Sequence, residues 1–185
     1  MTDEERALAE IVVRLEALSI PYMVAGSFAS SFHGRPRTTQ DADVVIDPTP
    51  AALDQLVQIL EAAGFYVDRS RARDALARRR AFNVVELRSA FKVDLIIRKQ
   101  RPFSAEEFRR RMRARLAGGT EVALATPEDT VLSKLEWAKQ AGGSERQILD
   151  ASGVVAVCRD IDRAYVARWA KELDVLDLWL RIAPG

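Results

Sequence analysis

The hydrophobic pattern of this chain changes repeatedly between a helical and a strand period, and this alternation limits the fold more than any other feature. Apolar residues recur at helical spacing over residues 3–18 and again over 51–63. Short apolar runs typical of strands lie at 41–47 and 91–97. The pattern therefore predicts an α/β (α+β) fold, in which helices flank a mixed sheet.

The remaining elements divide the chain into two regions. Further strands are expected at 21–27, 64–68, 81–88 and 120–127, the last of them as an edge strand, and further helices at 27–32 and 104–116. From Thr126 the pattern is helical almost to the end. We therefore expect a unit of residues 1–125 that contains the sheet, followed by a helical C-terminal region of residues 126–185 packed on it.

Charge and cysteine content exclude several classes of protein. The 28 Lys and Arg residues nearly balance the 27 Asp and Glu residues, so the net charge of +1 gives no global attraction to nucleic acid or to an anionic membrane. Cys158 is the only cysteine, which excludes an internal disulfide and suits a reducing compartment. The acidic start and the lack of an apolar run of about 18 residues indicate neither export nor membrane insertion, so we expect a cytoplasmic protein.

Two aspartates stand one residue apart at the start of the strand expected at 41–47. Residues i and i+2 of a strand face the same side, so Asp41 and Asp43 place two carboxylates in one small volume. Asp94 lies in the apolar run 91–97, where a charge is costly to bury unless it is paired or coordinates a cation. If the two strands are neighbours, the three carboxylates form a cluster that suits Mg²⁺ or Mn²⁺ better than Zn²⁺. Taken alone, an Asp-x-Asp pair is also common in turns and at helix N-caps, where the aspartates have a structural role.

A glycine-serine pair lies upstream of the aspartates at a spacing that is similar to a known family. Gly26 and Ser27, thirteen intervening residues, the Asp-x-Asp strand and the later Asp94 resemble the polymerase-beta-like nucleotidyltransferase superfamily. The stretch HGRPRTTQDADVVI resembles its minimal bacterial branch, which is related to the abortive-infection toxins of type IV toxin-antitoxin systems. The positions that match this branch are His33, Gly34, Arg37, Thr39, Asp41 and Asp43.

A second signature of the same branch is similar to the start and middle of the C-terminal region, so the resemblance covers about residues 20–155. It consists of a Pro-Glu-Asp helix start, a Lys-Leu pair and a basic residue followed by an aspartate, which here are matched by Lys134, Arg146 and Asp150. Gln147 departs from it, because the family often has an acid there. Lys134 could also extend from a buried helix face, and Arg146 and Asp150 could form an intrahelical ion pair of little energetic weight.

The resemblance implies a metal-dependent transfer of a nucleoside monophosphate from a nucleoside triphosphate such as ATP to an acceptor hydroxyl, with release of pyrophosphate. It implies Asp41, Asp43 and Asp94 as catalytic residues and as ligands of Mg²⁺ or Mn²⁺. The nucleotide-binding residues that it implies are Gly26, Ser27, Arg37, Thr39 and Lys134. The acceptor would be an RNA end or a protein, in a toxin-like role, and a cognate antitoxin would be a partner. A second copy of the chain could also be a partner, on the separate ground that an exposed edge strand or the tryptophan-containing helices could form a dimer.

Other interpretations stay open at this point. The chain could keep the fold but act by binding, as an antitoxin or partner subunit, or it could be a nucleotide-binding structural protein whose aspartates hold a cation. The arginine-rich stretches 69–80 and 109–115 could form solvated faces, or a basic rim suited to an acceptor such as tRNA. We expect His33 to act as a structural hydrogen-bonding group and not as a base.

Overall fold

The computed structural model describes residues 2–36, 41–116 and 118–183. Contacts divide the chain into two compact units, the first made of residues 1–24 and 39–124 and the second of residues 25–38 and 125–185. The second unit thus includes a segment from the N-terminal half of the chain. The two domains expected from the sequence, 1–125 and 126–185, stay a prediction.

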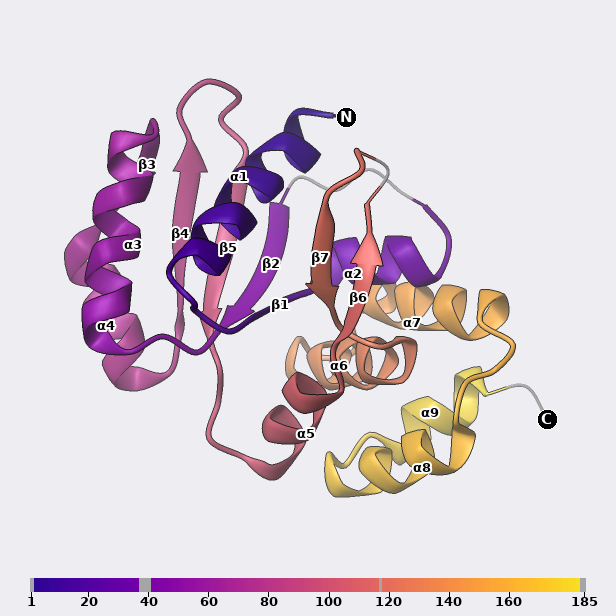
Figure 1. Cartoon of the computed structure of the whole chain (residues 1–185). Helices are drawn as coiled ribbons and strands as arrows, with labels where there is room; N and C mark the ends of the chain where they lie inside the picture. Colours follow the sequence, from indigo (N-terminus) through magenta and orange to yellow (C-terminus); the bar gives the residue numbers. More distant parts are fainter. Residues whose placement is uncertain (1, 37–40, 117, 184–185) are drawn as a thin grey trace. The chain divides into compact units, whose positions relative to one another are not determined.

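A mixed sheet forms the centre of the first unit (Figure 1). In the part of the chain that the structure describes, the sheet has seven strands in the order β3-β4-β5-β2-β1-β7-β6. The pairs β2–β5 and β1–β7 are parallel, whereas β3–β4, β4–β5 and β6–β7 are antiparallel. The mixed sheet expected from the sequence is therefore confirmed. The strands are β1 (Tyr22–Ala25), β2 (Asp41–Ile46), β3 (Phe65–Val67), β4 (Ala81–Glu86), β5 (Lys92–Ile97), β6 (Met112–Arg115) and β7 (Glu121–Leu124).

In its described residues, the first unit has the helices α1 (Asp3–Ala17), α3 (Pro50–Ala62), α4 (Arg69–Arg78) and α5 (Pro102–Arg110). The helix α1 contacts β2 and α3, and α4 contacts β4 and β5. Alternate residues of β2, β4 and β5 are fully or almost fully buried, for example Val44, Val84 and Leu95. Burying a side chain of this kind contributes about 1.5–3 kcal/mol, so one face of these strands provides much of the core. On the other face, the residues of β2 and β5 are half-exposed and those of β4 are mostly exposed.

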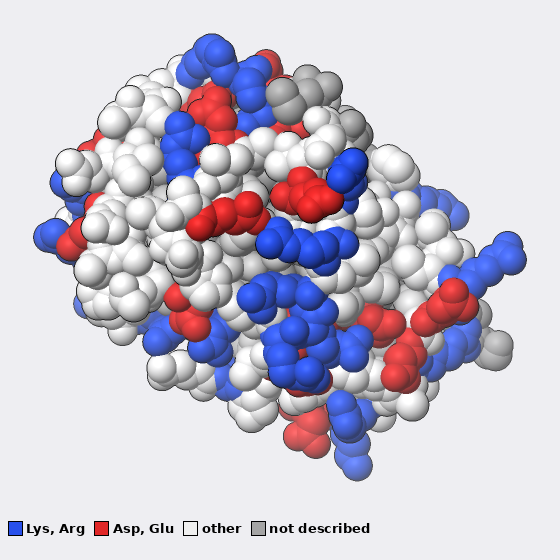
Figure 2. Space-filling view, in the orientation of Figure 1, with Lys and Arg blue, Asp and Glu red and all other residues white. Residues whose placement is uncertain are grey.

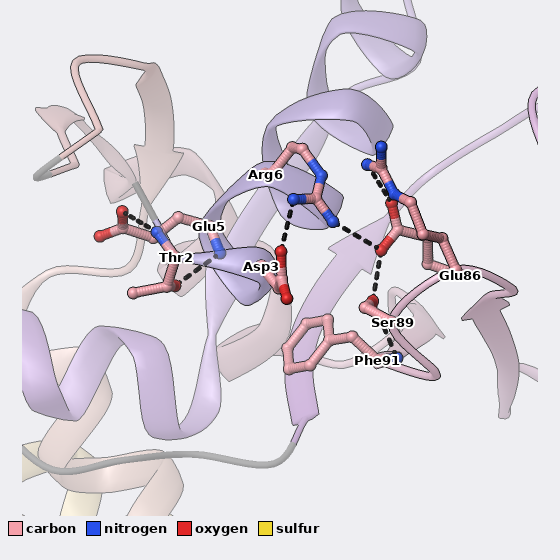
Figure 3. A network of polar contacts seen from close by, with 8 residues as sticks. Thr2, Asp3, Glu5, Arg6, Glu86, Ser89 and Phe91 are labelled. Carbon is pink, nitrogen blue, oxygen red and sulfur yellow. Dashed lines mark hydrogen bonds and ion pairs between the residues drawn. The ribbon is translucent and has the colours of Figure 1, made fainter.

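A buried carboxylate ties the start of α1 to the end of β4 (Figure 3). Arg6 Nη2 donates to Glu86 Oε2 at 3.2 Å, and Ser89 and Arg88 also donate to this carboxylate. Burial raises the pKa of Glu86, but the hydrogen bonds from Ser89, Arg6 and Arg88 outweigh it and hold the pKa below its usual value. The carboxylate therefore stays ionised and fixes α1 against the sheet.

Two local expectations are wrong in the first unit. The helix expected over 104–116 ends at Arg110, and Met112–Arg115 instead form β6, which pairs with β7 in an antiparallel hairpin. Gly119 has a φ of +86°, and the Leu116 N–H donates to the Thr120 carbonyl at 2.9 Å, so a turn brings the two strands together. Strand pairing thus overrides the helix propensity of the arginines. Consequently β6, and not residues 120–127, is the edge of the sheet.

The second unit is helical in its described part. Its helices are α2 (Gly26–His33), α6 (Pro127–Gln140), α7 (Glu145–Val157), α8 (Arg163–Glu172) and α9 (Leu176–Ile182). The helix α6 contacts α2, α7 and α8, and α9 contacts α7 and α8. None of the helices in the described ranges is long and apolar enough to cross a membrane.

The Pro-Glu-Asp signature at the start of α6 has a structural role in this unit. Asp129 is 1% exposed, and its carboxylate accepts hydrogen bonds from Thr126 Oγ1 at 2.7 Å and from the Tyr165 hydroxyl at 2.6 Å. Glu128 is also buried and accepts from the Asp162 N–H at 3.2 Å. Both acids therefore connect the start of α6 to α8 and the turn before it, and they satisfy polar groups that burial would otherwise leave unpaired.

The His-Gly pair that ends α2 also packs within the second unit. A Cβ atom on Gly34 would lie 2.9 Å from Gly153 C and Val154 N of α7, which is closer than real contacts allow. His33 is buried, and its Nε2 donates to the Ala125 carbonyl at 2.7 Å. Burial lowers the pKa of His33 below its ordinary value. The expected structural role of His33 agrees with this environment, since a buried neutral imidazole holds the end of α2 in place.

Candidate active site

The strands β2 and β5 place the three predicted carboxylates on one face of the sheet. These strands are parallel neighbours, and their register pairs Asp43 with Asp94 and Asp41 with Lys92. Neighbouring strands are about 4.8 Å apart, and alternate residues of a strand share a face. Asp41, Asp43 and Asp94 therefore lie on the half-exposed face, opposite the buried residues of the same strands. Their roles in catalysis and metal binding stay predictions.

A lysine lies among these carboxylates. Lys92 Nζ is 3.0 Å from Asp94 Oδ2 and 3.5 Å from Asp41 Oδ2, so one ammonium group contacts two of the three acids. Asn83, on the neighbouring strand β4, donates from its amide to Asp94 Oδ1. The hydrogen bond to Asp94 is the main cause that raises the pKa of Lys92, and the charge of Asp41 adds to it. Lys92 therefore carries its positive charge in this patch at neutral pH.

The donor set fits a hard divalent cation, although its side chains are not gathered around one. Three carboxylates on one face of two adjacent strands supply only oxygen ligands, which is the chemistry that Mg²⁺ and Mn²⁺ prefer. As the side chains lie, no group of three His, Cys, Asp or Glu residues within the described ranges is arranged to hold a metal ion. Lys92 accounts for part of this, because Asp41 and Asp94 are both directed to its ammonium group. The ammonium group of Lys92 and the carboxylates would have to separate before the carboxylates could hold a cation.

The glycine-serine pair begins α2 directly after β1. Gly26 has a φ of +58°, a left-handed conformation that glycine adopts without strain, and it is the first residue of the helix. The N-cap residue Ala25 offers no side-chain cap, and Ser27 is buried. A helix start of this kind presents backbone N–H groups, which favour an anion. This local geometry is the one expected for a phosphate-binding turn.

One backbone hydrogen bond shows in which direction β1 and β2 run relative to each other. The Asp47 N–H, just after β2, donates to the carbonyl of Pro21, just before β1, at 3.0 Å. The end of β2 thus lies beside the start of β1, and the two neighbouring strands run in opposite directions. Asp41, at the start of β2, therefore lies toward the C-terminal end of β1.

The other predicted nucleotide-binding residues have different outcomes. Arg37 and Thr39 lie outside the described residues. Lys134 lies on α6 and is buried, and its Nζ donates to Asp150 Oδ2 of α7 at 2.8 Å. The carboxylate of Asp150 thus contacts a lysine of another helix, and the intrahelical pair of Arg146 and Asp150 stays a prediction. A role of Lys134 in nucleotide binding stays a prediction.

The arginine-rich stretches are largely neutralised by nearby acids. Figure 2 shows blue groups in the middle of one face with red groups close beside them. Exposed pairs of this kind contribute about 0–1 kcal/mol each, so they describe a solvated surface better than a stabilising network. The pairs of the first stretch are Arg69–Glu61, Arg71–Asp68, Arg73–Asp54, Arg78–Asp74 and Arg79–Asp47, and those of the second are Arg109–Glu106, Arg113–Glu16 and Arg115–Glu121.

A groove of about 440 Å³ in the first unit is distinct from the carboxylate patch. Its lining includes Glu16, Tyr22, Arg111 and Arg113, but none of the predicted site residues. The hydrogen bond from Arg113, followed by that from Tyr22, lowers the pKa of Glu16, and burial is the main cause that raises the pKa of Tyr22 to about 12. These groups satisfy one another, so the groove belongs to the packing of α1, β1 and β6 and not to the candidate site.

The sequence prediction did not include Lys92 and Asn83, although both contact the candidate site. Lys92 stands two residues before Asp94, so the strand period alone could have placed it on the same face. Asn83 could not have been found in this way, because its contact depends on the antiparallel register that pairs it with Asp94.

Comparisons with known proteins identify the fold. The antigenic nucleotidyltransferase-like protein of Paracoccidioides brasiliensis has a TM-score of 0.59 to this chain at 19% identity, with 98% of this chain and 94% of that chain covered. The crystal structure of ANT(2″)-Ia in complex with adenylyl-2″-tobramycin has a TM-score of 0.58 at 13% identity, with coverage of 98% and 100%. JHP933 from Helicobacter pylori has a TM-score of 0.50 at 13% identity, with coverage of 97% and 78%.

These similarities show a nucleotidyltransferase-like α/β fold, in agreement with the fold expected from the sequence. The searches of protein-family models and of curated protein sequences gave no match. At these identities the similarity is one of fold alone.

Proposed function

We propose that this chain is a metal-dependent nucleotidyltransferase, which transfers a nucleoside monophosphate from a nucleoside triphosphate to an acceptor hydroxyl. The observation that supports it most is the parallel register of β2 and β5, which pairs Asp43 with Asp94 and leaves Asp41 on the same face. These three acids lie on adjacent strands of a nucleotidyltransferase-like fold. Three carboxylates in one small volume become favourable when a divalent cation neutralises them.

In this proposal Asp41, Asp43 and Asp94 hold Mg²⁺ or Mn²⁺. When bound by these three residues, the cation would supply positive charge that offsets the negative charge developing in the transfer. Gly26 lets the backbone approach the phosphates at the start of α2, and Ser27 provides a hydroxyl there. The family resemblance adds Arg37, Thr39 and Lys134 as further residues that bind the nucleotide.

The proposed transfer is a single displacement at phosphorus. The oxygen of the acceptor hydroxyl forms a bond to the α-phosphorus, and its proton passes to the carboxylate of Asp94. The bond between the α-phosphorus and the oxygen that bridges to the β-phosphate breaks, and pyrophosphate leaves with that electron pair. Because this chemistry needs little covalent help from the protein, the chain's main contribution is to position the reactants and to balance charge.

The acceptor that we propose is an RNA end or a protein hydroxyl, as expected for a toxin-like enzyme. A structural neighbour has been crystallised with adenylyl-2″-tobramycin, so a small hydroxyl-bearing compound belongs in any assay as a third acceptor class. The alternative is a partner subunit or antitoxin that binds nucleotide without turnover. The contact of Lys92 with two of the three carboxylates is the observation that favours this alternative.

The test is a label-transfer assay with α-labelled ATP, CTP, GTP and UTP in turn, in Mg²⁺ or Mn²⁺. Total RNA, total protein and tobramycin serve as acceptors. Wild type is compared with Asp43→Asn and with the matched control Asp54→Asn, whose carboxylate forms an exposed pair with Arg73. We expect transfer by wild type and Asp54→Asn and a loss of at least about 100-fold in Asp43→Asn. Equal transfer by Asp43→Asn would contradict the assigned role, and nucleotide binding without transfer would favour the partner subunit.

A further inference from the structure

We propose that Lys92 is a built-in counter-ion of the carboxylate patch, which a divalent cation must displace in order to bind. This inference rests on the proposed function, since it concerns the same three carboxylates. It assigns to Lys92 a specific task, which is to set how tightly the patch binds a metal ion. Lys92 is a positioning residue in this account and not a catalytic one.

The strand register places the ammonium group of Lys92 between two of the acids. Lys92 is the cross-strand partner of Asp41 and stands two residues before Asp94, so all three side chains lie on one face. The distances of 3.0 Å to Asp94 Oδ2 and 3.5 Å to Asp41 Oδ2 show that one cation is shared by two carboxylates. An ordinary surface ion pair would need only one acid.

Both oxygens of Asp94 have a partner in this arrangement. Asn83 donates to Oδ1 and Lys92 donates to Oδ2. Asn83 is neutral, and its amide is positioned by strand β4, so it can stay in place when a cation arrives. Lys92 carries a positive charge, so it is the group that a divalent cation repels from this carboxylate.

The exposure of these side chains allows the displacement. The side chain of Lys92 is 40% exposed, compared with 41% for Asp41 and 21% for Asp94. The lysine side chain is long and flexible. At this exposure it can move its ammonium group into water, so that no lysine charge stays buried. The patch thus keeps a counter-ion when no metal is bound and releases it when one binds.

Removing the charge of Lys92 is therefore expected to strengthen metal binding. The variant Lys92→Met keeps a side chain of similar length without the ammonium group. The matched control is Lys99→Met, which changes an exposed lysine that follows the end of β5. Binding is measured by titrating the full chain with Mn²⁺ in metal-free buffer, with free Mn²⁺ quantified by electron paramagnetic resonance, and melting is measured with and without Mn²⁺.

We expect Lys92→Met to bind Mn²⁺ about five- to tenfold more tightly than wild type and Lys99→Met, because a competing positive charge has been removed. Without metal, Lys92→Met is expected to melt at a lower temperature, and Mn²⁺ is expected to raise its melting temperature more than that of wild type. If Lys92→Met does not fold, Lys92→Gln provides the same test with a polar side chain.

The inference would be overturned if the Lys92 variant bound Mn²⁺ as tightly as wild type or more weakly. It would also be overturned if neither wild type nor the Lys92 variant bound Mn²⁺. The titration needs no turnover, so its result is separate from that of the label-transfer assay. Tighter binding without transfer would leave the counter-ion role intact and reject the proposed function. If wild type transfers the label and Lys92→Met binds Mn²⁺ with unchanged affinity, the proposed function stands and the counter-ion role of Lys92 is rejected.

Discussion

Replacing Asp150 with asparagine removes the carboxylate that contacts the buried ammonium group of Lys134. The two side chains are 10% and 5% exposed, and their atoms are 2.8 Å apart, so the pair is buried and lies between α6 and α7. Removing one partner of a buried ion pair costs about 3–5 kcal/mol, since the other charge loses its compensation. For a chain of this size about 1 kcal/mol corresponds to about 2–4 °C, so we expect Asp150→Asn to lower the melting temperature by about 6–20 °C.

The second unit offers a matched control for this change. Lys139 and Asp174 form an ion pair whose side chains are 45% and 91% exposed. Asp174→Asn makes the same chemical substitution next to a lysine in water, and asparagine tolerates the positive φ of 56° at this position. Exposed pairs contribute about 0–1 kcal/mol, so this variant should melt within about 4 °C of wild type.

Thermal melting followed by circular dichroism measures both variants, and urea unfolding gives the free energies. A cost below about 1 kcal/mol for Asp150→Asn would refute the reasoning, because Lys134 would then not depend on Asp150. In that case Lys134 could turn to a nucleotide phosphate, as the family resemblance implies. Adding Lys134→Met to Asp150→Asn is expected to restore part of the lost stability, since it removes the buried charge.

Two further predictions concern the end of α2. Gly34→Ala is expected to lower the free energy of unfolding by about 1–3 kcal/mol in urea titrations, because its Cβ would lie 2.9 Å from backbone atoms of α7; unchanged stability would show that these helices separate readily. The pKa of His33 is lowered by burial, so the unfolded chain binds its proton more readily and stability should fall as pH drops below about 6.5. Stability measured from pH 7.5 to 5.5 should fall less in His33→Gln than in wild type, and parallel curves would contradict this.

The sequence was sufficient for the parts of the fold that depend on local periodicity. Alternation of apolar residues in 41–47 and 91–97 correctly indicated strands, and the structure makes them the parallel neighbours β2 and β5. The pairing of these two strands is what places Asp94 beside Asp43, and the sequence pattern did not contain it. The pattern was less informative where tertiary pairing decides, as in Met112–Arg115, whose arginines favour a helix in isolation but form β6 beside β7.

The candidate site shows the same limit. The sequence identified the acids, and the strand period puts Lys92 on the same face as Asp94, but the contact of Lys92 with Asp41 depends on strand register. Helical spacing also suggested Arg146 beside Asp150, but it could not show that Lys134 of α6 contacts the same carboxylate. Contacts between elements that are distant in sequence decided both cases, and periodicity within one element does not report them.

The most direct test of the central claim is a crystal structure of the chain with Mn²⁺ and a nucleoside triphosphate analogue that cannot release pyrophosphate. Anomalous scattering from manganese locates the metal independently of any assumed chemistry. The account predicts manganese bound to Asp41, Asp43 and Asp94, triphosphate at Gly26 and Ser27, and Lys92 turned away from the carboxylates. Manganese bound elsewhere, or a bound nucleotide with Lys92 still between Asp41 and Asp94, would contradict it.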